Sequence, residues 1–202
     1  QSITQTKKEI NRMKTLECIA RAKKRRGIDT YKYKVSICIP AYKQPAHLRK
    51  ALQSIVIQTF TNYEVVITDD SPDDSMEKVV KEFEQNLNIK YLKNSETKGS
   101  PENWNEAIRH STGEYIKILH HDDWFPDSNC LSEFVKMLDE HPEADFAFSG
   151  SLNYNIQGLK FTHKAKPKQI HNLQKDPMFI FCGNFIGAPS ATIYRRNLNI
   201  FF

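Results

Sequence analysis

The sequence predicts an α/β fold with a mainly parallel sheet flanked by helices. Short apolar runs alternate with amphipathic segments of about 10–15 residues, and polar residues follow several of the apolar runs directly. Strands that alternate with helices of this length form βαβ units, whose strands run parallel and are covered on both faces. We therefore expect one sheet with helices on its two sides.

Five apolar runs have the length and composition of strands, at 35–42, 63–68, 88–92, 114–119 and 144–150. Helices are expected between them, because proline opens three of the intervening segments and apolar residues recur at helical spacing in all four. The three prolines are Pro45, Pro101 and Pro126. Residues 151–170 are polar and predict an irregular hairpin or loop, and 189–196 predict one more strand.

A basic segment precedes the first strand. Residues 1–34 carry 11 Lys and Arg against 3 Asp and Glu, whereas residues 35–202 carry 18 against 21. We expect 1–33 to be a helical arm ending in the run Lys23–Arg26, either solvated and docked on the body or drawn to anionic lipid headgroups. The other two parts are expected at 34–150 and 151–202, and the apolar end at Phe201–Phe202 suggests that the second is truncated.

Composition narrows the classes of protein. The slightly acidic body predicts no nucleic-acid partner, because a nucleic-acid footprint places basic charge on the folded domain. No apolar run reaches the roughly 20 residues of a membrane-spanning helix, and no signal peptide is visible. The four cysteines are far apart without a C-x-x-C pair, which favours free thiols in a reducing cytoplasm over a zinc cluster or a disulfide framework.

Acidic residues follow two of the expected strands, at Asp69–Asp70 and at Asp122–Asp123. In an open parallel sheet, ligands bind at the carboxyl ends of the strands. Two adjacent carboxylates repel each other unless a cation or donor satisfies them, and Mg²⁺ or Mn²⁺ is the natural partner. We expect Asp122 and Asp123 to hold such a cation, whereas Asp73 and Asp74 are expected to cap a helix.

Three segments in order carry a family resemblance: VSICIPAY, VVITDDSPDDS and KGSPENWNEAIRHSTGEYIKILHHDD. Together they resemble glycosyltransferase family 2, over roughly residues 34–150, and GAPSATIYRR adds a weaker likeness. The resemblance implies the Rossmann-like GT-A fold and a nucleotide-sugar donor, most often a UDP-sugar. It further implies an inverting, metal-dependent transfer to a glycan or lipid-linked acceptor, in bacterial polysaccharide or glycoconjugate biosynthesis.

The resemblance also implies roles for single residues. The ring of Tyr42 would pack on the base, and Asp70 would accept from the base N3–H while Asp69 supports the loop. Asp122 would contact the ribose or share the cation, and Asp123 would be the metal ligand that bridges the diphosphate. The remaining residues expected around the nucleotide are Pro40, Ala41, Gly99 and Asn103. Trp104, which follows the matched asparagine, is expected in the core.

The family's carboxylate general base has no counterpart here, because no acidic residue follows Asp176. We expect it beyond residue 202 and assign no catalytic residue. Two other hypotheses stay open. One is a non-catalytic nucleotide-binding or assembly module, held at a partner or at the inner face of the membrane by the basic arm. The other is a metallohydrolase built from His120–Asp123 with His163 and His171, since imidazole and carboxylate groups suit transition metals.

Overall fold

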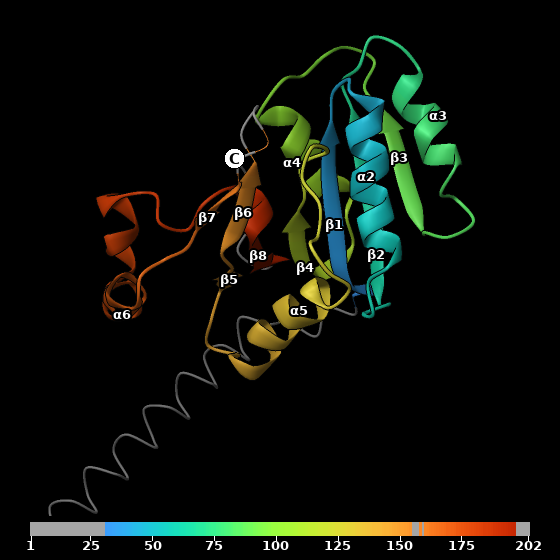
Figure 1. Ribbon diagram of the computed structural model, residues 1–202. Coiled ribbons are helices and arrows are strands. Elements are labelled where there is room, and N and C mark those ends of the chain that lie inside the picture. Colours follow the sequence, from blue (N-terminus) through green and yellow to red (C-terminus); the bar gives the residue numbers. More distant parts are fainter. Residues whose placement is uncertain (1–30, 155–157, 159, 197–202) are drawn as a thin grey trace, which may run out of the picture.

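The computed structural model describes residues 31–154, 158 and 160–196, so the helical arm predicted over 1–33 lies almost wholly outside them. Six strands form one sheet in the order β3-β2-β1-β4-β8-β5 (Figure 1). The first four pair in parallel, and β8 is antiparallel to both of its neighbours. The strands are β1 (Tyr33–Ala41), β2 (Tyr63–Asp69), β3 (Ile89–Lys93), β4 (Gly113–Ile118), β5 (Phe146–Phe148) and β8 (Thr192–Arg195).

Helices cover both faces, which confirms the predicted fold class. One apolar core joins the sheet to α2 (Pro45–Val56), α3 (Ser75–Lys81) and α5 (Cys130–Glu140). A smaller core on the opposite face joins it to α4 (Glu102–His110). Because side chains alternate along a strand, β1 sends Ile37 and Ile39 into the first core and Cys38 into the second.

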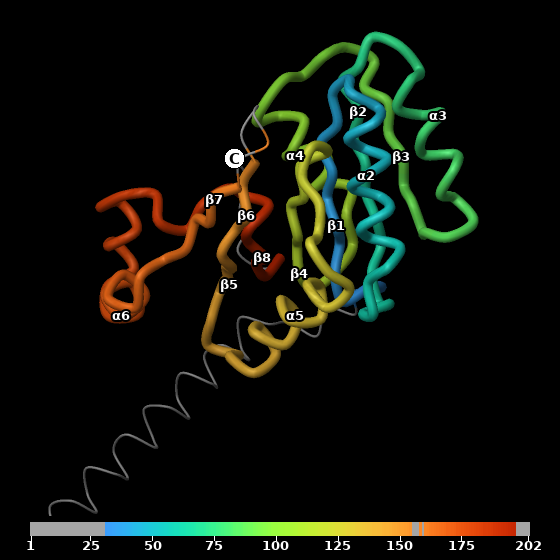
Figure 2. The backbone as a smooth tube through the Cα atoms, in the orientation of Figure 1, coloured from blue at the N-terminus to red at the C-terminus, as the bar shows by residue number. Residues whose placement is uncertain are grey.

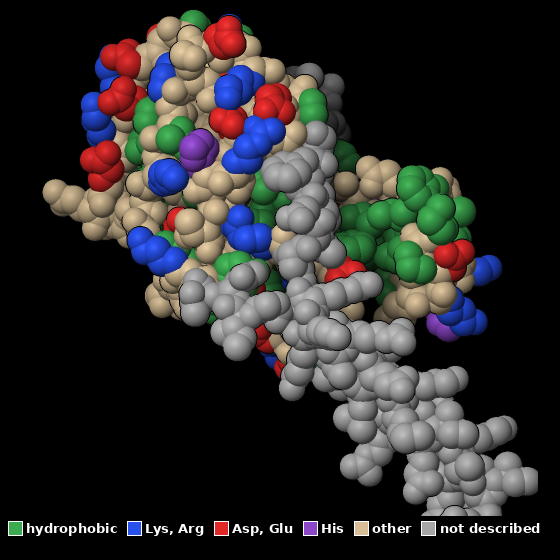
Figure 3. Space-filling model, turned by 180° about the vertical axis from the view of Figure 1, so that it is seen from behind, with side chains coloured by type: hydrophobic (Ala, Val, Ile, Leu, Met, Phe, Trp, Pro, Cys, Tyr) green, Lys and Arg blue, Asp and Glu red, His purple; other side chains and the backbone are tan. Residues whose placement is uncertain are grey.

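The chain after β5 builds a small lobe beside the sheet, and its path can be followed in Figure 2. The predicted hairpin is formed by β6 (Ser151–Tyr154) and β7 (Lys160–His163), which pair antiparallel. The helix α6 (Pro167–Lys175) and the 3-10 turn η1 (Pro177–Cys182) follow, and a second 3-10 turn, η2 (Pro189–Ala191), leads into β8. Figure 3 shows apolar side chains gathered on the lobe, where Met178 and Phe181 are exposed.

One helix start was predicted wrongly. Pro126 does not open α5, which begins at Cys130. The intervening turn is held from outside by Gln58, whose Nε2 donates to the carbonyl of Asp127 at 2.8 Å and whose Oε1 accepts from Leu131 N–H at 2.9 Å. A side chain 73 positions away therefore satisfies the start of the helix, and no local pattern reports it.

Two properties of the described residues bear on the cysteine and membrane expectations. Cys38, Cys130 and Cys182 are free thiols. Within the described ranges, no helix has the length and apolar character needed to cross a membrane.

Candidate functional site

A pocket of about 300 Å³ opens where β1, β2 and β4 end. All seven residues predicted around a nucleotide line it, although they come from four separate segments of the chain. They are Pro40, Ala41, Tyr42, Asp70, Gly99, Asn103 and Asp122. The parallel register explains the convergence, because Ala41 is paired with Asp69 at the carboxyl ends of β1 and β2.

The two aspartates after β2 have different surroundings. Asp69 is fully buried and is not among the residues that line the pocket. It accepts from Ser71 N–H, the Tyr91 hydroxyl and the Lys93 ammonium at 2.7–2.9 Å. These partners fit the supporting role expected of Asp69. Burial raises the pKa of the Tyr91 phenol, and its hydrogen bond to Asp69 raises that pKa further, because ionisation would place a second negative charge beside the carboxylate.

Asp70 lines the pocket and organises the loop before α4. Its Oδ1 accepts from Asn94 Nδ2 at 2.6 Å and from Lys98 N–H at 3.2 Å, and its Oδ2 accepts from Gly99 N–H at 2.8 Å. A carboxylate has about four acceptor positions. Gly99 N–H is the one donor to Oδ2 among the described residues, so a second acceptor position on this oxygen stays available to a ligand.

Gly99 and Asn103 shape the wall through the backbone. Gly99 has φ +72°, a left-handed conformation that glycine adopts without strain, and this turns its N–H toward Asp70. Asn103 Nδ2 donates to the carbonyls of Ala41 and Thr68, both at 3.2 Å, so the amide ties the ends of β1 and β2 to α4. Its geometry is that of a positioning residue.

The turn between β1 and α2 presents the Tyr42 ring, which is 44% exposed. Lys43 and Gln44 both have positive φ, an uncommon arrangement for residues other than glycine that costs of order 1 kcal/mol each. Lys43 N–H donates to Ser71 Oγ at 2.7 Å, which fastens this strained turn to the loop after β2. The strain lies beside the pocket, where functional constraints concentrate.

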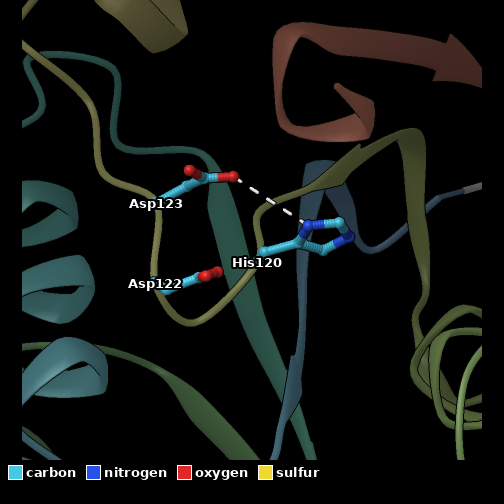
Figure 4. Close-up of side chains that lie close together, drawn as sticks. All are labelled: His120, Asp122 and Asp123. Carbon is cyan, nitrogen blue, oxygen red and sulfur yellow. Dashed lines mark ion pairs between the residues drawn. The ribbon is translucent and has the colours of Figure 1, made fainter. Parts of the chain in front are cut away.

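The loop after β4 brings His120, Asp122 and Asp123 together (Figure 4). One ligand atom from each lies within 4.8 Å of the others, and His120 Nδ1 is 3.9 Å from Asp123 Oδ2. The loop is closed by Asp123 N–H, which donates to the His120 carbonyl at 3.0 Å. Asp122 lines the pocket, whereas Asp123 lies beside it.

These three side chains have the chemistry of a divalent cation site. Carboxylates suit Mg²⁺ and Mn²⁺, and a neutral imidazole can add a nitrogen ligand. Burial lowers the pKa of His120, so the ring is neutral at pH 7, and its buried Nε2 has no hydrogen-bond partner among the described residues. The residues present therefore fit the predicted metal, with His120 as an addition to the two aspartates.

Several pocket residues were not predicted. They are Thr97, Ser100, Trp104, His120 and His121. The core assignment of Trp104 is wrong: the indole lines the pocket and packs on His120, with ring centroids 4.6 Å apart. The pair His120–His121 before two aspartates could have indicated further pocket residues. Whether the two rings face the pocket, however, depends on how β4 ends.

The histidines invoked for a metallohydrolase are not gathered here. Within the described residues, the single group of three or more potential ligands is His120, Asp122 and Asp123, without His163 or His171. His163 instead lies against Gly187 in the lobe.

Solved structures share this fold. The chain superposes on TarS 1–349 from S. aureus in complex with UDP-GlcNAc with a TM-score of 0.65, at 22% identity over 84% of this chain and 48% of that one. It superposes on the mannosyltransferase PcManGT from Pyrobaculum calidifontis, in complex with GDP-Man and Mn²⁺, with a TM-score of 0.60 at 21% identity, over 91% and 52%. The architecture is therefore that of the GT-A glycosyltransferases.

Sequence comparison identifies the family. The profile described as Glycosyl transferase family 2 matches residues 36–201, most of the chain. This chain belongs to glycosyltransferase family 2.

Two relatives illustrate the range of the family. The Escherichia coli UDP-Glc:alpha-D-GlcNAc-diphosphoundecaprenol beta-1,3-glucosyltransferase WfgD is 33% identical over 84% of this chain and 63% of its own. Glycosyltransferase GlyA of Streptococcus pneumoniae is 29% identical over 64% of this chain and 18% of its own. The chain thus spans less than two thirds of the length of either relative.

Proposed function

We propose that this chain forms the donor-binding part of a glycosyltransferase that uses a UDP-sugar and a divalent cation. The observation that carries the proposal is the pocket at the ends of β1, β2 and β4, which Tyr42, Asp70 and Asp122 line together. The relative WfgD uses UDP-Glc according to its name, and TarS forms complexes with UDP and UDP-GlcNAc.

The pocket can recognise uracil through two contacts. The half-exposed Tyr42 ring offers a face on which the base stacks. The acceptor position left on Asp70 Oδ2 suits the imide N–H of uracil, a donor that cytosine lacks at the same ring position. The three bonds that already hold Asp70 keep the carboxylate oriented, so binding costs little further ordering.

Asp122 and Asp123 would hold Mn²⁺ or Mg²⁺, with His120 beside them. A bound cation supplies Lewis-acid stabilisation of the departing diphosphate. The loop that carries the three side chains is itself held in place. The Ser190 hydroxyl accepts from His120 N–H at 3.0 Å and fixes the start of this loop. Pocket walls of Trp104 and Pro40 limit the access of water to the donor.

The acceptor is proposed to be a glycan or a lipid-linked sugar, transferred with inversion in polysaccharide or glycoconjugate biosynthesis. The names of two relatives support this class: WfgD acts on a diphosphoundecaprenol-linked sugar and TarS on poly(ribitol-phosphate). We assign no general base among the described residues.

The test is calorimetric titration of the chain with UDP, GDP and CDP, each with and without Mn²⁺. We expect UDP to bind most tightly and Mn²⁺ to strengthen it. Asp70→Asn replaces an acceptor with an amide donor facing backbone N–H groups, so UDP affinity should fall at least tenfold, about 1.4 kcal/mol. Asp123→Ala should remove the increment due to Mn²⁺ while the fold is retained.

Asp74→Ala is the matched control, because this exposed carboxylate pairs with Lys78 on the surface and is remote from the pocket residues in its contacts. It should bind UDP and Mn²⁺ as the unmodified chain does. The proposal fails if none of the three nucleotides binds, or if Asp123→Ala keeps the full effect of Mn²⁺.

A further inference from the structure

Four side chains from four separate parts of the chain form a strip in which two neighbouring aromatic rings lie between two lysines. Lys50 Nζ of α2 lies 3.2 Å from the centroid of the Trp124 ring. The centroids of the Trp124 and Tyr154 rings are 5.7 Å apart, and the two ring planes are tilted by 38°. Lys160 Nζ of β7 lies 5.3 Å from the Tyr154 ring. We call these four residues the cation–aromatic strip.

The strip begins where the candidate cation site ends. Trp124 follows Asp123 directly in the chain, so its ring is carried by the same loop that gathers His120, Asp122 and Asp123. None of the four strip residues lines the pocket assigned to the donor. A second ligand bound on the strip would therefore approach the cation site from outside the donor pocket.

The strip keeps free binding capacity. Tyr154 is 46% exposed, and the side chains of Lys50 and Lys160 are exposed as well. Neither ammonium group forms an ion pair with a described residue, although both hold positive charge close to an aromatic face. No carboxylate of the described residues neutralises the two charges, so they remain available to an anion.

The two kinds of side chain suit two parts of one ligand. The exposed part of the Tyr154 side chain offers aromatic surface against which the slightly positive C–H groups of a sugar or polyol can pack. A lysine ammonium is a point charge that binds phosphate. Two lysines that form no ion pair with a described residue lie at the two ends of an aromatic pair. This arrangement matches a hydroxylated carbon skeleton that carries phosphate.

We propose that the cation–aromatic strip is the acceptor subsite, and that it takes a sugar or polyol bearing a phosphate group. The inference deepens the proposed function and rests on it, because it names the chemical class of the acceptor. The phosphate can belong to a sugar 1-phosphate headgroup or to a polyol phosphate. Lys50 and Lys160 select the charge, and Trp124 and Tyr154 seat the skeleton.

The chain offers a direct readout, since it has two tryptophans, Trp104 in the donor pocket and Trp124 in the strip. Trp104→Phe leaves Trp124 as the single fluorescent reporter of the strip, and Trp124→Phe leaves Trp104 as the reporter of the donor pocket. The probes for Trp104→Phe are α-D-glucose 1-phosphate, sn-glycerol 1-phosphate, methyl α-D-glucoside and inorganic phosphate.

We expect saturable quenching of Trp124 by at least one of the two organic phosphates, with an affinity at least tenfold above those of the glucoside and inorganic phosphate. Tighter binding of glucose 1-phosphate would identify a sugar 1-phosphate headgroup as the ligand, and tighter binding of glycerol 1-phosphate would identify a polyol phosphate. Adding Lys50→Met and Lys160→Met should reduce that affinity at least tenfold. Lys32→Met, which removes an exposed lysine over the Tyr33 ring, is the matched control and should change nothing.

The inference is overturned if inorganic phosphate or the neutral glucoside binds as tightly as the organic phosphates, or if the two lysine substitutions leave the affinity unchanged. A response on Trp104 in Trp124→Phe, with none on Trp124 in Trp104→Phe, would put the sugar phosphate in the donor pocket and overturn it too. UDP with Mn²⁺, followed on Trp104, tests the donor assignment separately, so the two failures are distinguishable.

Discussion

At the scale of single residues, Lys117 is the most unusual side chain of the sheet. It is fully buried in β4, faces Phe134 in the core, and donates to the carbonyls of Ile118 and Ser190. Burial lowers the pKa of Lys117 to about 7, because the charged form loses its hydration. The residue links the end of β4 to η2, next to the candidate cation loop.

The lowered pKa predicts a specific dependence of stability on pH. Between about pH 7 and the ordinary lysine pKa near 10.4, Lys117 is protonated in the unfolded chain and neutral in the folded one. The unfolded state then binds more protons, so the free energy of unfolding rises with pH, by up to about 1.4 kcal/mol per unit. Relative to Lys117→Met, the unmodified chain should therefore gain stability from pH 7 to pH 10.

Urea unfolding of both chains at pH 7, 8, 9 and 10 measures this gain. The slope reports titration alone, whatever constant loss follows from the missing hydrogen bonds. Lys32→Met, which removes an exposed lysine, is the control for the loss of one lysine charge. Parallel stability curves for Lys117→Met and the unmodified chain would mean that Lys117 titrates normally in the folded state.

At the scale of elements, Arg195 joins β8 to the end of α5. Its buried guanidinium donates to the carbonyls of Leu138 at 2.6 Å, His141 at 3.3 Å and Ala144 at 2.8 Å. A cation at the carboxyl end of a helix satisfies carbonyls that have no helical partner and complements the helix dipole. The planar guanidinium presents several N–H donors in a fixed arrangement, and this lets one side chain serve all three carbonyls.

Arg195→Lys keeps the charge but offers one nitrogen in place of the fork. We expect it to lower the free energy of unfolding by about 2–3 kcal/mol, the order of a lost charged hydrogen bond in a buried site. Arg49→Lys, at an exposed ion pair with Glu82, should lower the free energy of unfolding much less, because solvent screens that pair. Denaturant unfolding measures both, and equal losses would contradict the element-joining role.

The start of β4 has no room for a side chain. A Cβ on Gly113 would lie 2.6 Å from Ser36 N and 2.7 Å from Val35 C, both in the backbone of β1. Gly113→Ala must displace one strand from the other, so a loss of about 1–3 kcal/mol is expected, the usual cost of overpacking. Gly150→Ala, whose nearest neighbour is at 3.1 Å, should cost less in the same thermal or urea unfolding assay. A neutral Gly113→Ala would show that β1 and β4 can separate freely.

At the scale of the whole molecule, a single sheet positions all the loops of the candidate site. The loops after β1, β2 and β4 form the donor pocket, while β8 enters the sheet next to β4 from the far end of the chain. The Ser190 hydroxyl and carbonyl, just before β8, bind His120 and Lys117. Ligand binding at the pocket should therefore stabilise the described chain as a unit.

The expected outcome is a rise in the midpoint of thermal unfolding with UDP and Mn²⁺. A ligand at about 100 times its Kd adds about 2.7 kcal/mol, which corresponds to a shift of about 5–10 °C for a chain of this size. Differential scanning calorimetry with UDP, GDP and CDP measures the shift, and Asp123→Ala should lose the part due to Mn²⁺. No shift with UDP and Mn²⁺ would contradict the donor assignment.

The sequence by itself determined the class of fold and seven of the twelve residues that line the pocket. Both depend on local or short-range features: apolar runs such as 35–41 predict buried strands, and a residue that ends a parallel strand must lie at the ligand-binding edge. The family resemblance implied that Gly99 and Asn103 lie close to the nucleotide, and in the structure both line the pocket together with Asp70. These predictions required no knowledge of how distant segments pack.

Only the tertiary structure decided which side chains complete the site. Trp104 has the spacing of a core residue and lies in the pocket wall, and the start of α5 moved to Cys130 because Gln58 holds the preceding turn. The strip formed by Lys50, Trp124, Tyr154 and Lys160 is invisible in the sequence for the same reason. Its members meet through the packing of α2, the loop after β4 and a hairpin, and contacts between such distant segments leave no periodic pattern along the chain.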